Sequence, residues 1–70
     1  MNNNMYHFYL NSGKTVSVLG CMSNRQDTYT TIYKEIESGR EKGKVCTVAR
    51  FEHANIAGFI IEEVADADSN

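Results

Sequence analysis

The stretch SNRQDTYTTIYKEIES, residues Ser23–Ser38, decides the expected fold of this 70-residue chain. Its large apolar side chains recur at i, i+3, i+4 and i+7: Tyr29, Ile32, Tyr33 and Ile36. That spacing is typical of the buried stripe of an amphipathic helix. Ser23 and Gln26 fit a capping box, and Gly39 is able to end a helix in the left-handed conformation. The sequence therefore predicts one helix over residues 24–38.

Two strand-like runs precede this helix. Met5–Leu10 and Thr15–Leu19 are rich in aromatic and β-branched residues, which favour strands. The residues between them include Asn11 and Gly13, both of which tolerate positive φ in a tight connection. A β-hairpin over residues 5–19 is therefore predicted.

Within this hairpin, Gly13-Lys14-Thr15 matches the end of a phosphate-binding loop. Such a loop needs a glycine five positions before Gly13, where this chain has Phe8, and it also needs a helix directly after it. The residues after Thr15 have no helical period. The hairpin is therefore favoured over a nucleotide site.

Two further strands are predicted after the helix, at Val45–Glu52 and Ile56–Val64, joined by the short connection His53–Asn55. Antiparallel pairing of these two strands is the simplest arrangement. The predicted fold is α+β, with ββαββ order and a four-stranded antiparallel sheet that carries one amphipathic helix on one face. A single domain is expected over residues 5–64, with disordered ends at residues 1–4 and in the acidic segment 65–70. The strand order stays open between 2-1-4-3 and two hairpins split across a dimer.

The last strand begins with the run IAGFII, Ile56–Ile61, which is apolar on both of its faces. One helix covers only one face of a sheet, so a second copy of the chain is the simplest cover for the other. Burial of Phe59 and Ile61 would contribute about 3–6 kcal/mol per subunit. The residues predicted to form a homodimer interface are Ile56, Phe59, Ile60, Ile61, His7 and Tyr9.

The two cysteines, Cys21 and Cys46, indicate a reducing compartment rather than a disulfide-bonded secreted protein. The chain shows neither a signal peptide nor an apolar run long enough to span a membrane, so a cytoplasmic location and no membrane contact are expected. Cysteine and histidine do not occur in the local pairs from which zinc sites are built. No metal and no other cofactor is predicted.

The residues that could support catalysis lack catalytic surroundings in the sequence. His7 is interpreted as a partly buried sheet residue, His53 as a solvated turn residue, and Cys46 has no local base. We therefore expect no enzyme activity. The leading hypothesis is a homodimeric module that binds a protein partner.

Two alternatives belong to other classes. A weak nucleic-acid binder would use Arg40, Lys42 and Lys44 on phosphates, with the aromatic residues of the first strand on bases. The net charge of −2, together with Glu37 and Glu41 near the basic loop, argues against it. A small-ligand binder would hold its ligand in a pocket between two subunits.

Overall fold

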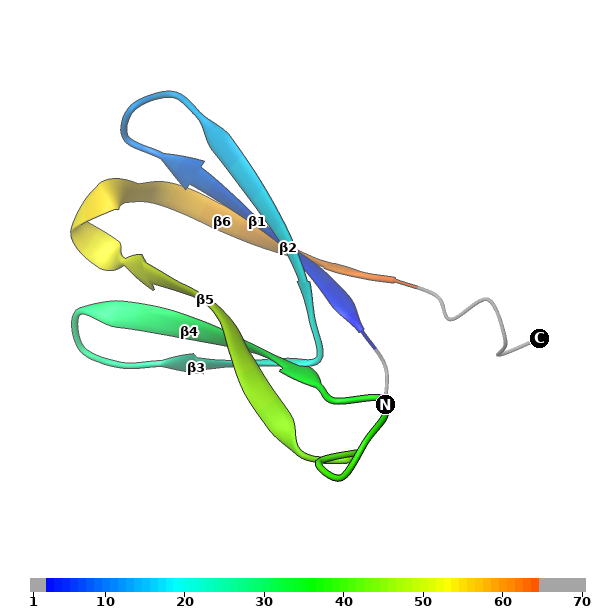
Figure 1. The fold of residues 1–70 in the computed structure, drawn as a ribbon. Coiled ribbons are helices and arrows are strands. Elements are labelled where there is room, and N and C mark those ends of the chain that lie inside the picture. Colours follow the sequence, from blue (N-terminus) through cyan, green and yellow to red (C-terminus); the bar gives the residue numbers. More distant parts are fainter. Residues whose placement is uncertain (1–2, 65–70) are drawn as a thin grey trace.

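The structure, a computed structural model that describes residues 3–64, contains six strands and one short 3₁₀ helix (Figure 1). The elements are β1 (Asn4–Leu10), β2 (Thr15–Gly20), β3 (Met22–Arg25), β4 (Tyr29–Glu35), β5 (Val45–Glu52), η1 (His53–Asn55) and β6 (Ile56–Glu63). The disordered ends predicted for residues 1–4 and 65–70 lie outside the described residues except for Asn3 and Asn4, and Asn4 is the first residue of β1.

The strands form two three-stranded antiparallel sheets, with the orders β2-β1-β6 and β3-β4-β5. The chain crosses from the first sheet to the second between β2 and β3, where only Cys21 separates the two strands. It crosses back through η1, between β5 and β6 (Figure 1). These two crossings act as corners that join the packed sheets.

The predicted ββαββ fold with a four-stranded sheet is wrong, because the described residues contain no α-helix. The predicted helix, residues 24–38, instead supplies the end of β3, all of β4 and the turn between them. β4 is the central strand of its sheet, and Thr30, Thr31 and Ile32 are buried in succession. In a strand that is buried on both faces, polar and apolar residues do not alternate. The spacing of its apolar residues therefore matched the pattern of an amphipathic helix.

The predicted pairing of the last two strands is also wrong. β5 pairs with β4, whereas β6 pairs with β1, because η1 turns the chain from one sheet into the other. The first and last strands therefore lie side by side, and the Val64 N–H donates to the Asn3 carbonyl across 3.2 Å. The predicted extents of β5 and β6 agree with the structure to within one residue.

The N-terminal hairpin is confirmed, with β1 and β2 paired from Asn4–Gly20 to Tyr9–Thr15. Of its two turn residues, only Gly13 takes a positive φ, of 92°. Asn11 has a different role, because its side-chain amide donates to the Ala54 carbonyl at 2.7 Å. Its backbone N–H donates to the Asn55 carbonyl at 2.9 Å. Asn11 thus ties the hairpin turn to η1.

The core lies between the sheets and is small. Among the described residues, three large apolar side chains are fully buried: Tyr6, Phe8 and Ile32. The ring of Phe8 stacks on that of Phe51, with centroids 3.8 Å apart, and so joins β1 of the first sheet to β5 of the second. Tyr6 and Phe8 define the inner face of the first sheet, the face toward the second sheet.

Gly20 lies at the corner between β2 and β3 and is itself buried. A Cβ atom at this position would lie 2.6 Å from Ile32 Cγ2 and 2.7 Å from the Tyr33 carbonyl oxygen. Next to it, the Cys21 N–H donates to that same carbonyl at 2.8 Å. The two backbones approach this closely only because residue 20 has no side chain.

We expect Gly20→Ala to lower the free energy of unfolding by about 3 kcal/mol, because the added methyl group meets backbone and a buried side chain. Gly58→Ala is the matched control, since a Cβ at Gly58 meets no atom within 4 Å. This control should be neutral or slightly stabilising. Urea denaturation of both variants measures the difference, and equal stability of the two would contradict the proposed close contact.

Candidate functional site

The edge strand β6 carries the longest run of consecutive exposed large apolar side chains among residues 3–64. β6 lies at the end of its sheet and pairs only with β1. Three consecutive side chains on it are about half exposed: Phe59 (46%), Ile60 (54%) and Ile61 (49%). An apolar edge strand of this length exposes unpaired backbone N–H and C=O groups together with hydrophobic side chains.

The register explains why these side chains are exposed. Phe59 lies opposite Phe8, and Ile61 lies opposite Tyr6, so both point to the inner face of the sheet. Phe8 and Tyr6 are fully buried whereas their neighbours on β6 are not. The second sheet therefore covers β1 and leaves β6 largely open.

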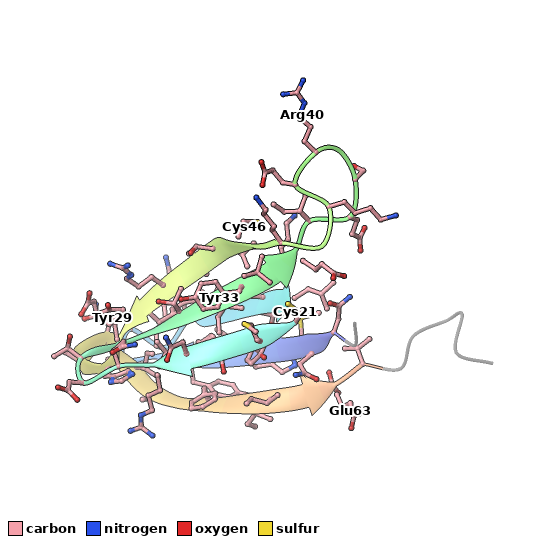
Figure 2. All side chains as sticks on the ribbon, turned by 90° about the horizontal axis from the view of Figure 1, so that it is seen from below. Cys21, Tyr29, Tyr33, Arg40, Cys46 and Glu63 are labelled. Atoms are coloured by element: carbon pink, nitrogen blue, oxygen red, sulfur yellow. The ribbon has the colours of Figure 1, made fainter. Side chains whose placement is uncertain are left out.

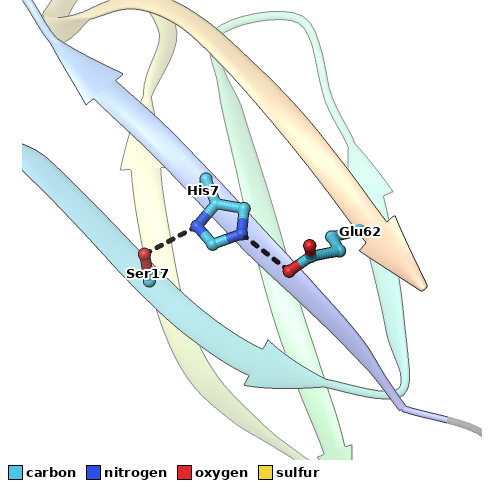
Figure 3. A network of polar contacts seen from close by, with 3 residues as sticks. All are labelled: His7, Ser17 and Glu62. Carbon is cyan, nitrogen blue, oxygen red and sulfur yellow. Dashed lines mark hydrogen bonds and ion pairs between the residues drawn. The ribbon is translucent and has the colours of Figure 1, made fainter. Parts of the chain in front are cut away.

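The outer face of the first sheet carries a polar network of His7, Ser17 and Glu62 (Figure 3). His7 on β1 lies between Ser17 on β2 and Ile60 on β6. Its Nδ1 is 2.7 Å from Ser17 Oγ, and its Nε2 is 3.3 Å from Glu62 Oε1. The imidazole is thus held from both sides, by a hydroxyl and a carboxylate.

The six predicted interface residues all belong to β1 and β6, but they divide between two faces. Ile60, His7 and Tyr9 belong to the outer face, and Phe59 and Ile61 to the inner face. Ile56 lies near η1 and is half-buried against the core. Phe59, Ile60 and Ile61 lie on the edge strand β6, whereas His7 and Tyr9 lie on the central strand β1.

Ser17, His7 and Glu62 are the residue types of a hydrolytic triad, yet their surroundings do not favour that chemistry. Ser17 and Glu62 are exposed on an open sheet face, and neither lines the cavity beside η1 or the one formed by Asn3, Leu19 and residues 34–38. Acyl transfer needs a substrate held next to preorganised oxyanion donors in a water-excluding site. The network fixes the orientation of the His7 ring through its two contacts.

The predicted phosphate contacts lie on the loop between β4 and β5. Arg40 points away from both sheets at the tip of this loop (Figure 2). Lys44 is ion-paired with Glu41, with Nζ 2.7 Å from Oε2. Of the aromatic residues proposed to stack on bases, Tyr6 and Phe8 are fully buried. Nucleic-acid binding stays a prediction, with Tyr9 left as the exposed aromatic residue of β1.

Both cysteines are free and half-buried, Cys21 at the corner after β2 and Cys46 on β5 (Figure 2). Within residues 3–64, no three side chains of the His, Cys, Asp or Glu type come together in a way that could hold a metal ion. The same residues include no helix with the length and apolar character needed to cross a membrane.

His53 was predicted to be a solvated turn residue, but it is half-buried and anchored. Its Nε2 is 2.7 Å from Oγ1 of Thr30, a buried residue of β4. Its backbone N–H donates to the Thr28 carbonyl at 2.8 Å. These contacts fasten the η1 corner to the second sheet.

Sequence reasoning identified the apolar run of β6, but it did not place that strand at a sheet edge and it missed both hydroxyl–imidazole contacts. Ser17 and His7 are 10 residues apart, and Thr30 and His53 are 23 apart. Only the strand register could have paired Ser17 with His7, and only the corner at η1 brings His53 to Thr30.

No protein-family model, curated protein or solved structure matches this chain.

The two hydroxyl–imidazole contacts have the same length but differ in burial, which gives a direct test of the site geometry. Thr30→Val should lower the free energy of unfolding by about 1–2 kcal/mol, because it leaves a partly buried ring nitrogen without its partner. Ser17→Ala should change it by less than about 0.5 kcal/mol, because water replaces the lost hydroxyl. Urea denaturation measures both values, and a larger loss for Ser17→Ala would contradict this assignment of burial.

Proposed function

We propose that the chain is a non-enzymatic homodimeric protein-interaction module whose interface is the free edge of β6. The single observation that supports this proposal is the exposure of Phe59, Ile60 and Ile61 on a strand with an unpaired edge. Proteins usually protect such edges by pairing, by charge or by a covering segment. The apolar part of β6, residues 56–61, carries no charged residue.

Pairing of β6 with β6 of a second copy is the arrangement that these features favour. A two-fold axis makes the same strand available on both copies, and edge-to-edge pairing would join the two sheets into one of six strands. Backbone hydrogen bonds would then form along the edge, while side chains on both faces of β6 contact their counterparts.

Charge favours the antiparallel orientation of the two strands. Glu62 and Glu63 lie at the C-terminal end of β6. Parallel pairing would set the carboxylates of both copies side by side, and like charges in that position are destabilising. Antiparallel pairing places them at opposite ends and brings Phe59 and Ile60, at the middle of the strand, close to the two-fold axis.

A cytoplasmic location belongs to the same proposal. Cys21 and Cys46 are both free, and free thiols are the normal state of cysteine in a reducing compartment.

Light scattering at micromolar concentration should give the mass of a dimer for the wild-type chain, and of a monomer for Ile60→Lys. Ile60 points to the outer face and is more than half exposed, so the lysine does not disturb the core. Two lysines near the two-fold axis would repel each other, and lysine is a common protecting residue on edge strands.

Val48→Lys is the matched control, because Val48 is an exposed apolar residue on β5, the edge strand of the other sheet. It should leave the dimer intact. A monomeric wild-type chain would overturn the proposal, and dissociation by Val48→Lys alone would move the interface to β5.

A further inference from the structure

A cavity of about 240 Å³ opens between the two sheets beside η1. Its lining combines both sheets and the corner: Phe8, Arg25, Thr30, His53, Ile56 and Phe59. This cavity lies within one copy of the chain, so it differs from the intersubunit pocket predicted from the sequence. It is also separate from Ile60, which points to the opposite face of the first sheet.

The apolar side of the cavity is a stack of aromatic rings. The Phe8 ring is nearly parallel to that of Phe59, with an angle of 18° and a centroid distance of 5.5 Å. The Phe8 ring also stacks on the Phe51 ring, with a centroid distance of 3.8 Å and the same interplanar angle. Phe8 is fixed by burial, whereas Phe59 is half exposed. A flat ring entering the cavity would therefore meet the exposed surface of Phe59, which is suited to stacking or edge-to-face contact.

The polar side of the cavity is basic. Arg25 ends β3 directly opposite Thr30, so its side chain belongs to the face of the second sheet that lines the cavity. No Asp or Glu lines the cavity, and among the described residues Arg25 takes part in no ion pair. The His53 ring is held in place by Thr30. The lining thus offers an unpaired guanidinium near aromatic rings and a fixed imidazole.

We propose that this cavity binds a small aromatic carboxylate with a single ring. The ring would pack against Phe59 and Ile56, which are partly exposed, and the carboxylate would accept hydrogen bonds from Arg25, whose planar fork matches a carboxylate with two parallel N–H donors. The cavity volume is below the roughly 300 Å³ at which sites for drug-sized ligands begin, which limits the occupant to one ring. This binding activity goes beyond dimerisation and uses residues of one chain, although one of them, Phe59, also belongs to the proposed dimer interface.

The proposal is tested by following backbone amide signals of the ¹⁵N-labelled full chain by NMR during titration with three probes. Benzoate supplies the ring and the charge, benzyl alcohol the ring alone, and inorganic phosphate the charge alone. We expect saturable shifts with benzoate, centred on Thr30, His53 and Phe59, and at least about tenfold weaker binding of the other two probes. Equal binding of all three, no binding of benzoate at millimolar concentration, or shifts centred elsewhere would overturn the proposal.

Arg25→Gln should weaken benzoate binding about tenfold or more, because it removes the charge-assisted contact. Arg40→Gln makes the same change in net charge on the loop between β4 and β5 and should leave the affinity unchanged. Arg25→Lys keeps the positive charge but loses the two parallel N–H donors of the guanidinium. Its affinity for benzoate should lie between those of the Arg25→Gln and Arg40→Gln variants. Equal affinities of the Arg25→Gln and Arg40→Gln variants would overturn the assignment.

Two controls separate this proposal from dimerisation and from a folding defect. Arg25 is exposed, so Arg25→Gln should unfold at the wild-type temperature. Ile60→Lys should bind benzoate as the wild type does, whatever its oligomeric state. Loss of binding in Ile60→Lys would show that the cavity needs the second copy and would overturn the single-chain site.

Discussion

The stack of Phe8 on Phe51 is the contact on which the rest of the structure depends, because it joins the centre of one sheet to the edge of the other. Together with Tyr6 and Ile32 it forms the centre of a small core. Small domains bury a modest share of their surface, so each large buried ring has a large effect on stability. The position of this stack also determines which apolar side chains stay exposed. The second sheet buries Tyr6 and Phe8 of β1, whereas the inner side chains of β6 beside them stay half exposed.

Alternate side chains of β6 consequently belong to two different surfaces of the first sheet. Phe59 faces inward and forms a wall of the cavity beside η1, whereas Ile60 faces outward beside His7. The two-residue period of a strand keeps these functions on opposite sides of the backbone. A change at Ile60 and a change at Arg25 therefore act on different surfaces, although both surfaces depend on the same strand.

The sequence predicted most strands well, and the errors have physical causes. The runs at Met5–Leu10, Val45–Glu52 and Ile56–Val64 were identified nearly to the residue, since their composition and local pattern agree with the final state. The central strand β4 was mistaken for a helix, because burial on both faces removed the alternation that identifies a strand. The threonines of β4 favour a strand over a helix, because β-branched residues are enriched in strands.

For the candidate site, composition alone was enough to find the apolar residues of β6. The contacts of Ser17, Thr30 and Arg25 could not be predicted, because they depend on strand register and on the two corners between the sheets. Since β1 is central in its sheet and its second neighbour is β6, more than forty residues must be added after β1 before that sheet is complete. During synthesis on the ribosome, β1 and β2 therefore emerge as a hairpin with an open flank. Such long-range pairing slows folding and leaves a period in which the nascent chain needs protection from association with its neighbours.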